Sequence, residues 1–352
     1  MSLFLDIAVQ EAIERIQKAY KMTDGKIYLS FSGGKDSTIV AELIKMANLP
    51  TDIPFVFADT GIEFNATTNF VKSYDYNNMV VVKPRKPFAK VLKDYGKPAI
   101  SKLKAEHLKT YQKNQNNPMK FARCRHLITG EAEKGGVKLG VRTQVALSEK
   151  HFHFLHPDHE YKIANQCCNY MKKYPFEDFA KENNMNGYIT GVRVAEGGIR
   201  ALKYTKCTNI KKVAGKDMVQ SMPIYDWTDS LCDEFVEKYN VQLSDVYTVY
   251  GMKRSGCVGC PYSPNIAKEL EVAFEYEPLR YKACMTWLKD VYLDQDVELP
   301  FDKEYELERI AENEKNDIRR TEMIVKYLPT MNRDIRKKLF DKYEDKGVAV
   351  DE

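Results

Sequence analysis

Residues 26–37, KIYLSFSGGKDS, form a short β-rich run that passes directly into a glycine-rich turn. The next residues, 38–46 (TIVAELIKM), carry apolar side chains at helical spacing, so the turn is expected to join a strand to a helix. Glycines leave room for backbone N–H groups to approach an anion, and the N-terminus of the helix contributes its positive end. This stretch therefore predicts a phosphate-binding loop at the end of a strand.

The alternation of strands and helices continues outward from this loop. An amphipathic helix is expected before it, over 7–19, and a charged helical region after Phe301. Strands are expected at Ile53–Ala58, Met79–Val82, Tyr188–Val192 and Val219–Pro223, and helices at Asn65–Lys72, Pro175–Asn183 and Asp229–Tyr239. Such alternation predicts an α/β fold with a doubly wound, mostly parallel sheet and helices on both faces. We expect a nucleotide-binding domain over 1–265, with an irregular insertion at about 84–160, and a helical C-terminal region over 266–352.

The bulk composition favours a cytoplasmic protein. The 352 residues include 54 basic and 50 acidic ones, so the net charge of +4 does not by itself indicate a nucleic-acid partner. No apolar run approaches the roughly 18–20 residues that a membrane span needs, and the N-terminal sequence lacks the apolar block of a signal peptide, so no membrane partner is expected. Residues 83–113 are locally basic, which is typical of a solvated helical face or of a surface that faces a polyanion.

Several groups in and near the loop are suited to hold phosphates. The candidate ligands are the hydroxyls or amides of Ser30, Ser32, Gly33, Gly34 and Ser37, together with the ammonium group of Lys35. Asp36 and Asp59 are candidates to hold a Mg²⁺ ion, which prefers oxygen ligands. An alternative for Asp59 is a helix N-cap.

Four stretches resemble the phosphoadenosine phosphosulfate (PAPS) reductase family. The loop SGGKDS resembles the PP-loop of the ATP-pyrophosphatase superfamily, and DTGIEF at 59–64, which includes Glu63, resembles the motif that follows it in PAPS reductase-like members. TGVRVAEGGIRA at 190–201 and PIYDWT at 223–228 resemble two later motifs of the family, in the same order.

The resemblance implies an adenine-nucleotide site. In the superfamily the loop holds the β- and γ-phosphates, and attack falls on the α-phosphorus. Lys35 and Asp36 would then act in catalysis, with Glu63 in nucleotide binding and with Arg193 and Arg200 facing anionic substrate groups, to which a guanidinium can donate two hydrogen bonds at once. Gly197 replaces the serine usual in the family, so one hydroxyl contact is missing. Thr228 is expected to cap the helix at Asp229–Tyr239.

Four of the eight cysteines have metal-ligand spacing, namely the adjacent Cys167 and Cys168 and the Cys-x-x-Cys pair Cys257 and Cys260. Two adjacent thiolates can reach separate irons of a cuboidal cluster, whereas zinc prefers a wider gap, although a zinc site and no metal both stay open. With a Lys and a Pro shortly after the tandem pair, the pattern resembles the [4Fe–4S] signature of adenylylsulfate reductases. The remaining cysteines, Cys124, Cys207, Cys232 and Cys284, are expected to be core or spare thiols.

A histidine-rich connector, HFHFLHPDH at 151–159, fits no single helix or strand face throughout. A metal site there is one interpretation, and a solvent-exposed loop is the preferred one.

Two departures from the reductases favour ATP cleavage. The family's nucleophilic tail cysteine has no counterpart after Cys284, and the SGGKDS loop is complete, which reductases do not need. The expected function is therefore cleavage of ATP at the α–β bond, with adenylation of an acceptor and release of pyrophosphate, in sulfur transfer or a sulfur-containing modification. Expected partners are an adenine nucleotide, an acceptor that the sequence does not identify, and a sulfur-donor protein or nucleic acid. Alternatives are a sulfonucleotide reductase that uses Cys284 or a partner's thiol, and a non-catalytic nucleotide- or DNA-binding regulator.

Overall fold

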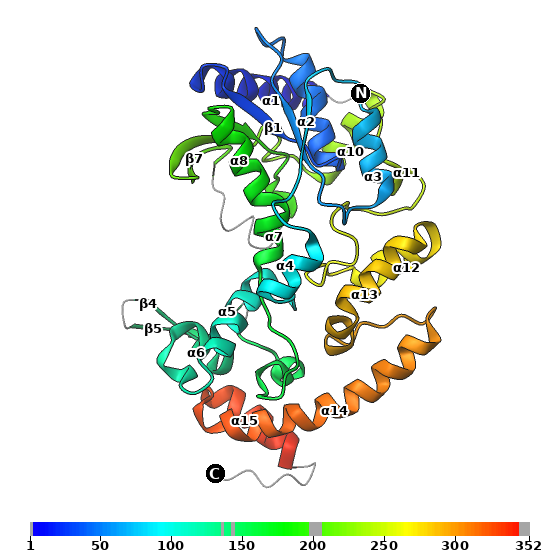
Figure 1. Cartoon of the computed structure of the whole chain (residues 1–352). Helices are drawn as coiled ribbons and strands as arrows, with labels where there is room; N and C mark the ends of the chain where they lie inside the picture. Colours follow the sequence, from blue (N-terminus) through cyan, green and yellow to red (C-terminus); the bar gives the residue numbers. More distant parts are fainter. Residues whose placement is uncertain (1–2, 135–136, 142–144, 197–205, 345–352) are drawn as a thin grey trace. The chain divides into compact units, whose positions relative to one another are not determined.

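The computed structural model describes residues 3–134, 137–141, 145–196 and 206–344, and Figure 1 colours the chain from its N- to its C-terminus. Internal contacts gather the chain into two units. The first unit comprises Met1–Phe88 and Cys168–Val258, and the second comprises Ala89–Cys167 and Gly259–Glu352. The expected domain boundary at residue 265 stays a prediction.

A six-stranded sheet in the order β3-β2-β1-β6-β8-β7 forms the centre of the first unit. Its strands are β1 (Ile27–Ser30), β2 (Phe55–Ala58), β3 (Met79–Val82), β6 (Gly187–Ile189), β7 (Thr208–Val213) and β8 (Lys216–Ser221). Every neighbouring pair is parallel except β7 and β8. The strand order runs outward from β1 in both directions, so the predicted mostly parallel, doubly wound sheet is confirmed.

Successive side chains of the central strands enter two different cores. Ile27 and Leu29 of β1 lie in a core with α1, α2, α3 and α10, whereas Tyr28 lies in a core with α8. These helices are α1 (Leu3–Met22), α2 (Lys35–Met46), α3 (Asn65–Ser73), α8 (Tyr174–Glu182) and α10 (Asp229–Lys238), which Figure 1 labels. Because neighbouring residues of a strand point to opposite faces, the sheet is covered on both faces, as predicted.

The second unit is mainly helical. Its elements are α4 (Phe88–Tyr95), α5 (Lys102–Lys113), α6 (Ala122–Thr129), the hairpin β4 (Glu131–Lys134) and β5 (Val137–Val141), α12 (Ile266–Tyr276), α13 (Pro278–Asp294), α14 (Lys303–Tyr327) and α15 (Arg333–Glu344). The helical structure predicted after Phe301 is confirmed by α14 and α15. Within the described residues, no helix is both long and apolar enough to cross a lipid bilayer.

The histidine-rich connector is not a solvent-exposed loop, so that prediction is wrong. Glu149–Leu155 forms a 3₁₀ helix whose Phe154 and Leu155 are fully or almost fully buried, and His153 is only 2% exposed. The helix packs against α14, and Leu155 also accepts a hydrogen bond from the hydroxyl of Tyr111. His153 is buried because the phenylalanines and the leucine beside it pack into the core. Neither helical nor strand periodicity in the sequence predicts this burial.

Candidate nucleotide-binding site

The predicted phosphate loop connects β1 to α2 in the first unit, and both of its glycines are required by its geometry. Gly33 has a φ of +68°, a left-handed conformation that favours glycine, and a Cβ there would lie 2.8 Å from Val71. A Cβ on Gly34 would lie 2.8 Å from Ser255 Oγ. The loop is therefore tightly enclosed by its neighbours, and any side chain at these positions would push them away.

The serine hydroxyls of the loop bond mainly to the loop itself. Ser37 Oγ accepts a hydrogen bond from the Ser32 amide at 3.2 Å and donates one to the Gly34 carbonyl at 2.9 Å. The hydroxyls of Ser32 and Ser37 lie 2.9 Å apart. Ser37 is 5% exposed, so its hydroxyl fixes the shape of the loop, while Ser30 and Ser32 line the adjoining cavity. Phosphate binding by these three serines stays a prediction.

Lys35 and Asp36 open α2 and are each held by a group distant in sequence. Lys35 Nζ donates to Asp233 Oδ1 at 2.7 Å; burial lowers the pKa of Lys35, but Asp233 more than compensates, so that the pKa is raised. Arg193 Nε donates to Asp36 Oδ1 at 3.1 Å. Burial raises the pKa of Asp36, and the Arg193 charge opposes that rise. The ammonium and the carboxylate are thus oriented in advance.

Arg193 is 4% exposed and bonds to the protein on three sides. Besides Asp36, its guanidinium donates to the Trp227 carbonyl at 3.1 Å and to Asp229 at 2.7 Å. This arrangement makes it a positioning residue for Asp36; direct contact with substrate stays a prediction. Thr228 next to it accepts from the Leu231 amide and caps α10, as predicted. Arg200 and Gly197 lie outside the described residues.

The glycine of the TGVR motif has a role that the sequence did not reveal. A Cβ on Gly191 would lie 2.7 Å from the backbone carbonyl carbon of Asp36 and 2.9 Å from the Ser37 amide nitrogen. The chain after β6 therefore lies directly against the first turn of α2. Only glycine permits this approach, which also brings Arg193 within reach of Asp36.

Asp59 and Glu63 follow β2, where they organise the turn before α3. Asp59 Oδ1 accepts from the Gly61 amide at 3.2 Å, so Asp59 caps a turn; the alternative of a helix N-cap is wrong, because α3 begins at Asn65 with Phe64 in the cap position. Glu63 is 4% exposed, and its Oε2 accepts from the Thr60 hydroxyl at 2.6 Å. Nucleotide or Mg²⁺ binding by either carboxylate stays a prediction.

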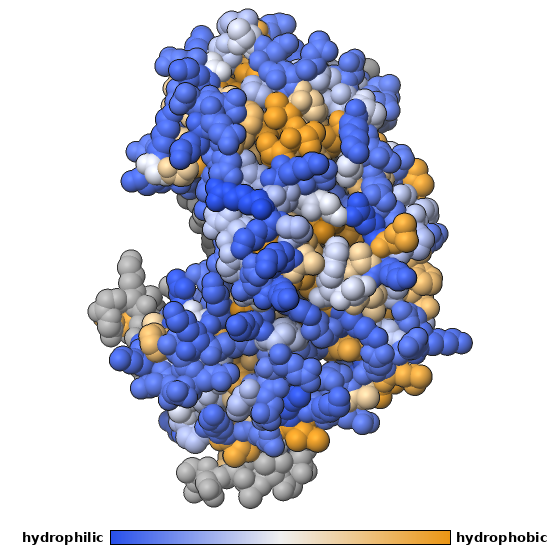
Figure 2. All heavy atoms as spheres, viewed as in Figure 1, coloured by the Kyte–Doolittle hydropathy of each residue, from blue (hydrophilic) through white to orange (hydrophobic). Residues whose placement is uncertain are grey.

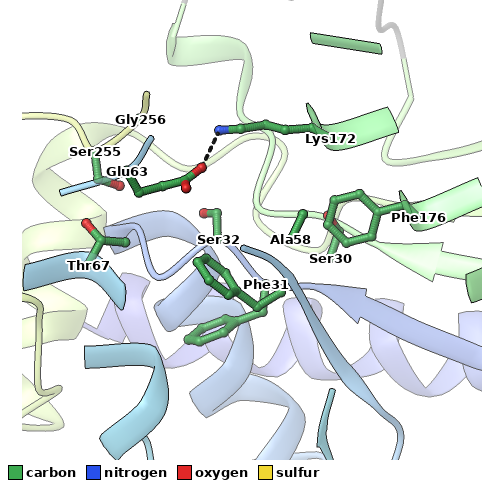
Figure 3. A pocket seen from close by; sticks show the side chains of 11 residues that line it. Ser30, Phe31, Ser32, Ala58, Glu63, Thr67, Lys172, Phe176, Ser255 and Gly256 are labelled. Carbon is green, nitrogen blue, oxygen red and sulfur yellow. Dashed lines mark ion pairs between the residues drawn. The ribbon is translucent and has the colours of Figure 1, made fainter. Parts of the chain in front are cut away.

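A cavity of 130 Å³ lies beside the loop, entirely within the first unit. It is lined by Ser30, Phe31, Ser32, Phe57, Ala58, Glu63, Thr67, Lys172, Phe176, Ser255 and Gly256. Figure 3 shows the ion pair on its wall, where Lys172 Nζ lies 3.5 Å from Glu63 Oε1. Sequence reasoning did not select Thr67, Phe176 or Ser255, since none belongs to a recognisable motif. Lys172 carried a weak signal, as the lysine that follows the tandem cysteines.

Two of the four candidate metal ligands lie in the first unit, where Lys172 interacts with both. The charge of Cys257 is the largest of the influences that raise the Lys172 pKa, and Cys168 contributes too. Burial raises the pKa of the Cys257 thiol, and Lys172 opposes that rise. Lys172 thus lies beside two of the four candidate ligands, where its charge would offset part of theirs when they are ionised.

Cys167 and Cys260 lie in the second unit. No disulfide joins any of the eight cysteines, all of which the structure describes. Among the described residues, no three or more His, Cys, Asp or Glu side chains are grouped so that they could hold a metal ion. The four-cysteine site therefore stays a prediction.

The tandem pair is followed by a local change of helix type. Gln166–Cys168 begin as α-helix (α7), Asn169–Lys173 continue as π-helix, and α8 follows. A π-turn inserts one extra residue per turn and rotates the side chains that follow, and such turns are frequent at functional sites. It precedes Phe176, which together with Lys172 of the π-turn lines the cavity.

A doubly wound sheet with a glycine-rich turn between a strand and a helix is an arrangement typical of nucleotide-binding α/β proteins. The model of the phosphoadenosine phosphosulfate reductase domain matches residues 26–122 and 116–263. The chain therefore belongs to the phosphoadenosine phosphosulfate reductase domain family.

Two relatives come from Methanocaldococcus jannaschii, the uncharacterized proteins MJ0973 and MJ0066. The first is 25% identical over 323 residues, which cover 87% of this chain and 61% of that protein. The second is 33% identical over 97 residues, which cover 27% of this chain and 20% of that protein. The chain thus spans about three-fifths of the first relative and about one-fifth of the second.

Three solved structures that match this chain share little sequence with it. The phosphoadenylyl-sulfate reductase of Candida auris, in a phosphate complex, is 12% identical with a TM-score of 0.41, covering 73% of this chain and 96% of that one. The FMN adenylyltransferase of Candida glabrata is 12% identical with a TM-score of 0.42, covering 72% and 62%. The U34-tRNA thiolase NcsA of Methanococcus maripaludis, with its [4Fe-4S] cluster, is 14% identical with a TM-score of 0.35, covering 82% and 80%.

Proposed function

We propose that this protein cleaves ATP between its α- and β-phosphorus atoms, transfers the adenylyl group to an acceptor and releases pyrophosphate. The observation that carries the proposal is the complete glycine loop at the end of β1, with Lys35 and Asp36 in the first turn of α2. A glycine-rich loop at a helix N-terminus is suited to a ligand that carries a diphosphate or triphosphate, because backbone amides and the positive end of the helix attract anions there.

The reaction places negative charge on the departing pyrophosphate. We assign the stabilisation of this charge to the Lys35 ammonium, which Asp233 holds at 2.7 Å in the free protein, and to the loop amides. Asp36 and Asp59 are the proposed ligands of a Mg²⁺ ion, which would neutralise phosphate charge when bound. Arg193 holds the Asp36 carboxylate at 3.1 Å and keeps it in one orientation.

Reduction of a sulfonucleotide is supported less well, because it needs an accessible thiolate. Cys284 is only 6% exposed, and a Cβ built on Gly259 would lie 3.1 Å from its sulfur atom. A packed thiol of this kind is a structural element and not a nucleophile.

The proposed acceptor chemistry is sulfur transfer or a sulfur-containing modification. It depends on the four cysteines holding a [4Fe–4S] cluster, with zinc as the alternative metal. When bound, a cluster would supply iron atoms that can carry an electron or bind a sulfur ligand. Lys172 would stay beside Cys168 and Cys257 and offset part of the thiolate charge. A nucleic acid or a sulfur-donor protein is the proposed partner.

The experiment offers ATP, Mg²⁺ and candidate acceptors to anaerobically prepared protein and measures AMP and pyrophosphate. Transfer RNA, DNA and small thiols are tested as acceptors in separate reactions, with adenylylsulfate and PAPS plus thioredoxin in parallel. Acceptor-dependent pyrophosphate supports the proposal. Sulfite from a sulfonucleotide without pyrophosphate from ATP would replace it with the reductase. Nucleotide binding without any turnover would favour the alternative of a non-catalytic regulator.

A further inference from the structure

The hydroxyl of Tyr247 occupies a position at the phosphate loop that suits an anion oxygen. Tyr247 belongs to α11 (Asp245–Thr248) of the first unit. Its oxygen accepts hydrogen bonds from the backbone amides of Lys35 at 3.0 Å and Ser255 at 3.2 Å. The Tyr247 hydroxyl in turn donates to Ser255 Oγ at 3.1 Å. Two amides that converge on one oxygen hold it as they would hold an oxygen of a phosphate group.

The Lys35 amide is one that the loop needs for its ligand. Lys35 is the first residue of α2, and the first amides of a helix have no partner within the helix and point outward. These are the amides that bind phosphates at helix N-termini. In the structure this donor is already used by Tyr247, so a phosphate can reach it only when the tyrosine hydroxyl leaves or shares it.

Neighbouring side chains also cover the loop sterically. A Cβ on Gly34 would lie 2.8 Å from Ser255 Oγ and 3.2 Å from the Tyr247 hydroxyl, so both side chains lie directly on the loop. The neighbouring cavity, which Ser32 and Ser255 help to line, has a volume of 130 Å³. Pockets that enclose a ligand of nucleotide size hold roughly 300–1,000 Å³. The cavity beside the loop is smaller than this in the structure.

The surrounding packing allows the side chain of Tyr247 to move while its helix stays in place. Val246 is fully buried, and α11 packs against α3, which anchors the backbone. Tyr247 itself is partly exposed. Gly251 and Gly256, on either side of Ser255, have open space where a Cβ would lie. A rotation of the phenol ring, with a small shift of Ser255 between two glycines, would uncover the Lys35 amide.

We propose that Tyr247 is the gate of the phosphate loop, and that an oxygen of a bound pyrophosphate group displaces its hydroxyl from the amides of Lys35 and Ser255. The exchange is favourable because a charged oxygen accepts stronger hydrogen bonds than a neutral phenol does. The inference rests on the proposed function only in taking a pyrophosphate group as the ligand. It adds that Tyr247 closes the phosphate loop in the free protein, and that ligand binding would shift Ser255, two residues before Cys257.

The test compares the full-length wild-type chain with Tyr247→Phe by isothermal titration with inorganic pyrophosphate and with α,β-methylene-ATP. The substitution keeps the ring and removes the competing oxygen, so pyrophosphate is expected to bind roughly fivefold more tightly, the equivalent of one net hydrogen bond. Ser255→Ala, which removes the acceptor of the Tyr247 hydroxyl, should shift affinity in the same direction. Tyr239→Phe is the matched control, because that ring packs on Phe235 of α10, and it should leave affinity unchanged.

Weaker binding by Tyr247→Phe would show that the hydroxyl is a ligand of the phosphate, and this would overturn the gate. Unchanged binding would also overturn the gate. Absence of pyrophosphate binding in both proteins would overturn it too. Hydrogen exchange gives a second measurement that needs no ligand, since the Lys35 amide should exchange faster in Tyr247→Phe. The proposed function fails separately: a wild-type protein that binds pyrophosphate but never turns over ATP would refute catalysis and leave the gate intact.

Discussion

Arg193 Nε donates a hydrogen bond to Asp36 Oδ1 at 3.1 Å, across 157 residues of sequence, and thereby joins the chain after β6 to the first turn of α2. The same guanidinium reaches Asp229 at the start of α10. One buried cation thus fixes three segments around the phosphate loop, which links the stability of the first unit to the geometry of its site.

Replacement of Arg193 by alanine should therefore cost stability. Asp36 would be left without its cation in a mostly buried position, and breaking such a pair costs about 3 kcal/mol. Urea unfolding of wild type and Arg193→Ala measures the loss. The double variant Arg193→Ala/Asp36→Asn should recover part of it, because no uncompensated charge remains at position 36. An equal loss in single and double variants would contradict this account.

Replacement of Lys35 by alanine should slow turnover strongly and keep the fold. Loss of one preorganised donor to the leaving pyrophosphate is worth about 3 kcal/mol, or roughly a hundredfold in rate. Pyrophosphate release is measured with each acceptor that wild type uses. The matched control is Lys45→Ala, a lysine on the same helix that pairs with Glu42. Equal rates for Lys35→Ala and wild type would remove the loop from the mechanism.

Acid should destabilise the protein through His153. Burial lowers the pKa of His153 to about 3, and the nearby Arg320, His151 and His159 also oppose its protonation. In the unfolded chain its pKa is near 6.5, so the stabilisation is complete above pH 6.5 and is lost as pH falls toward 3. At pH 5 the loss is about 2 kcal/mol.

The measurement is the free energy of unfolding of wild type and His153→Gln from pH 8 to pH 5. The variant should lose less stability over this range than wild type does. Burial raises the pKa of Asp294 to about 6, so its contribution has the opposite sign and increases as pH falls from 6 toward 3.8, but it is common to both proteins. His156→Gln, a histidine paired with Glu322, is the control. Parallel curves for wild type and His153→Gln would contradict a neutral buried His153.

The metal hypothesis predicts the colour of the protein. Anaerobically purified protein should be brown, absorb near about 400 nm and contain about four irons per chain. Cys168→Ser and Cys257→Ser should each lose most of the iron, whereas Cys207→Ser should keep it. A colourless protein that contains one zinc would replace the cluster with a structural zinc site. A folded protein without metal would contradict both the cluster and the zinc site.

Substitution of Cys284 should affect stability and not chemistry. The thiol is buried against Gly259, and a hydroxyl in its place would cost about 1–2 kcal/mol. Cys284→Ser is compared with wild type by thermal unfolding and by pyrophosphate release. If the wild type produces sulfite from adenylylsulfate or PAPS and Cys284→Ser does not, this cysteine is a nucleophile. That result would favour the sulfonucleotide reductase over ATP cleavage.

The sequence by itself determined the strand–loop–helix unit at Ile27–Met46, the mostly parallel sheet and the cap at Thr228. Each of these follows from local rules: the period of apolar residues, the backbone freedom of glycine, and the side-chain oxygen that a helix N-terminus requires. For the same reason the sequence alone indicates the serines, Lys35 and Asp36 as candidate site residues.

Only the tertiary structure decided what these side chains contact. The bonds of Lys35 to Asp233, of Asp36 to Arg193 and of the Lys35 amide to Tyr247 join segments about 160–210 residues apart. No local pattern encodes such partners, because they depend on how the strands are ordered in the sheet. The histidine-rich connector illustrates the same limit: its residues look like a polar loop, but the phenylalanines between them pack beneath α14 and bury His153.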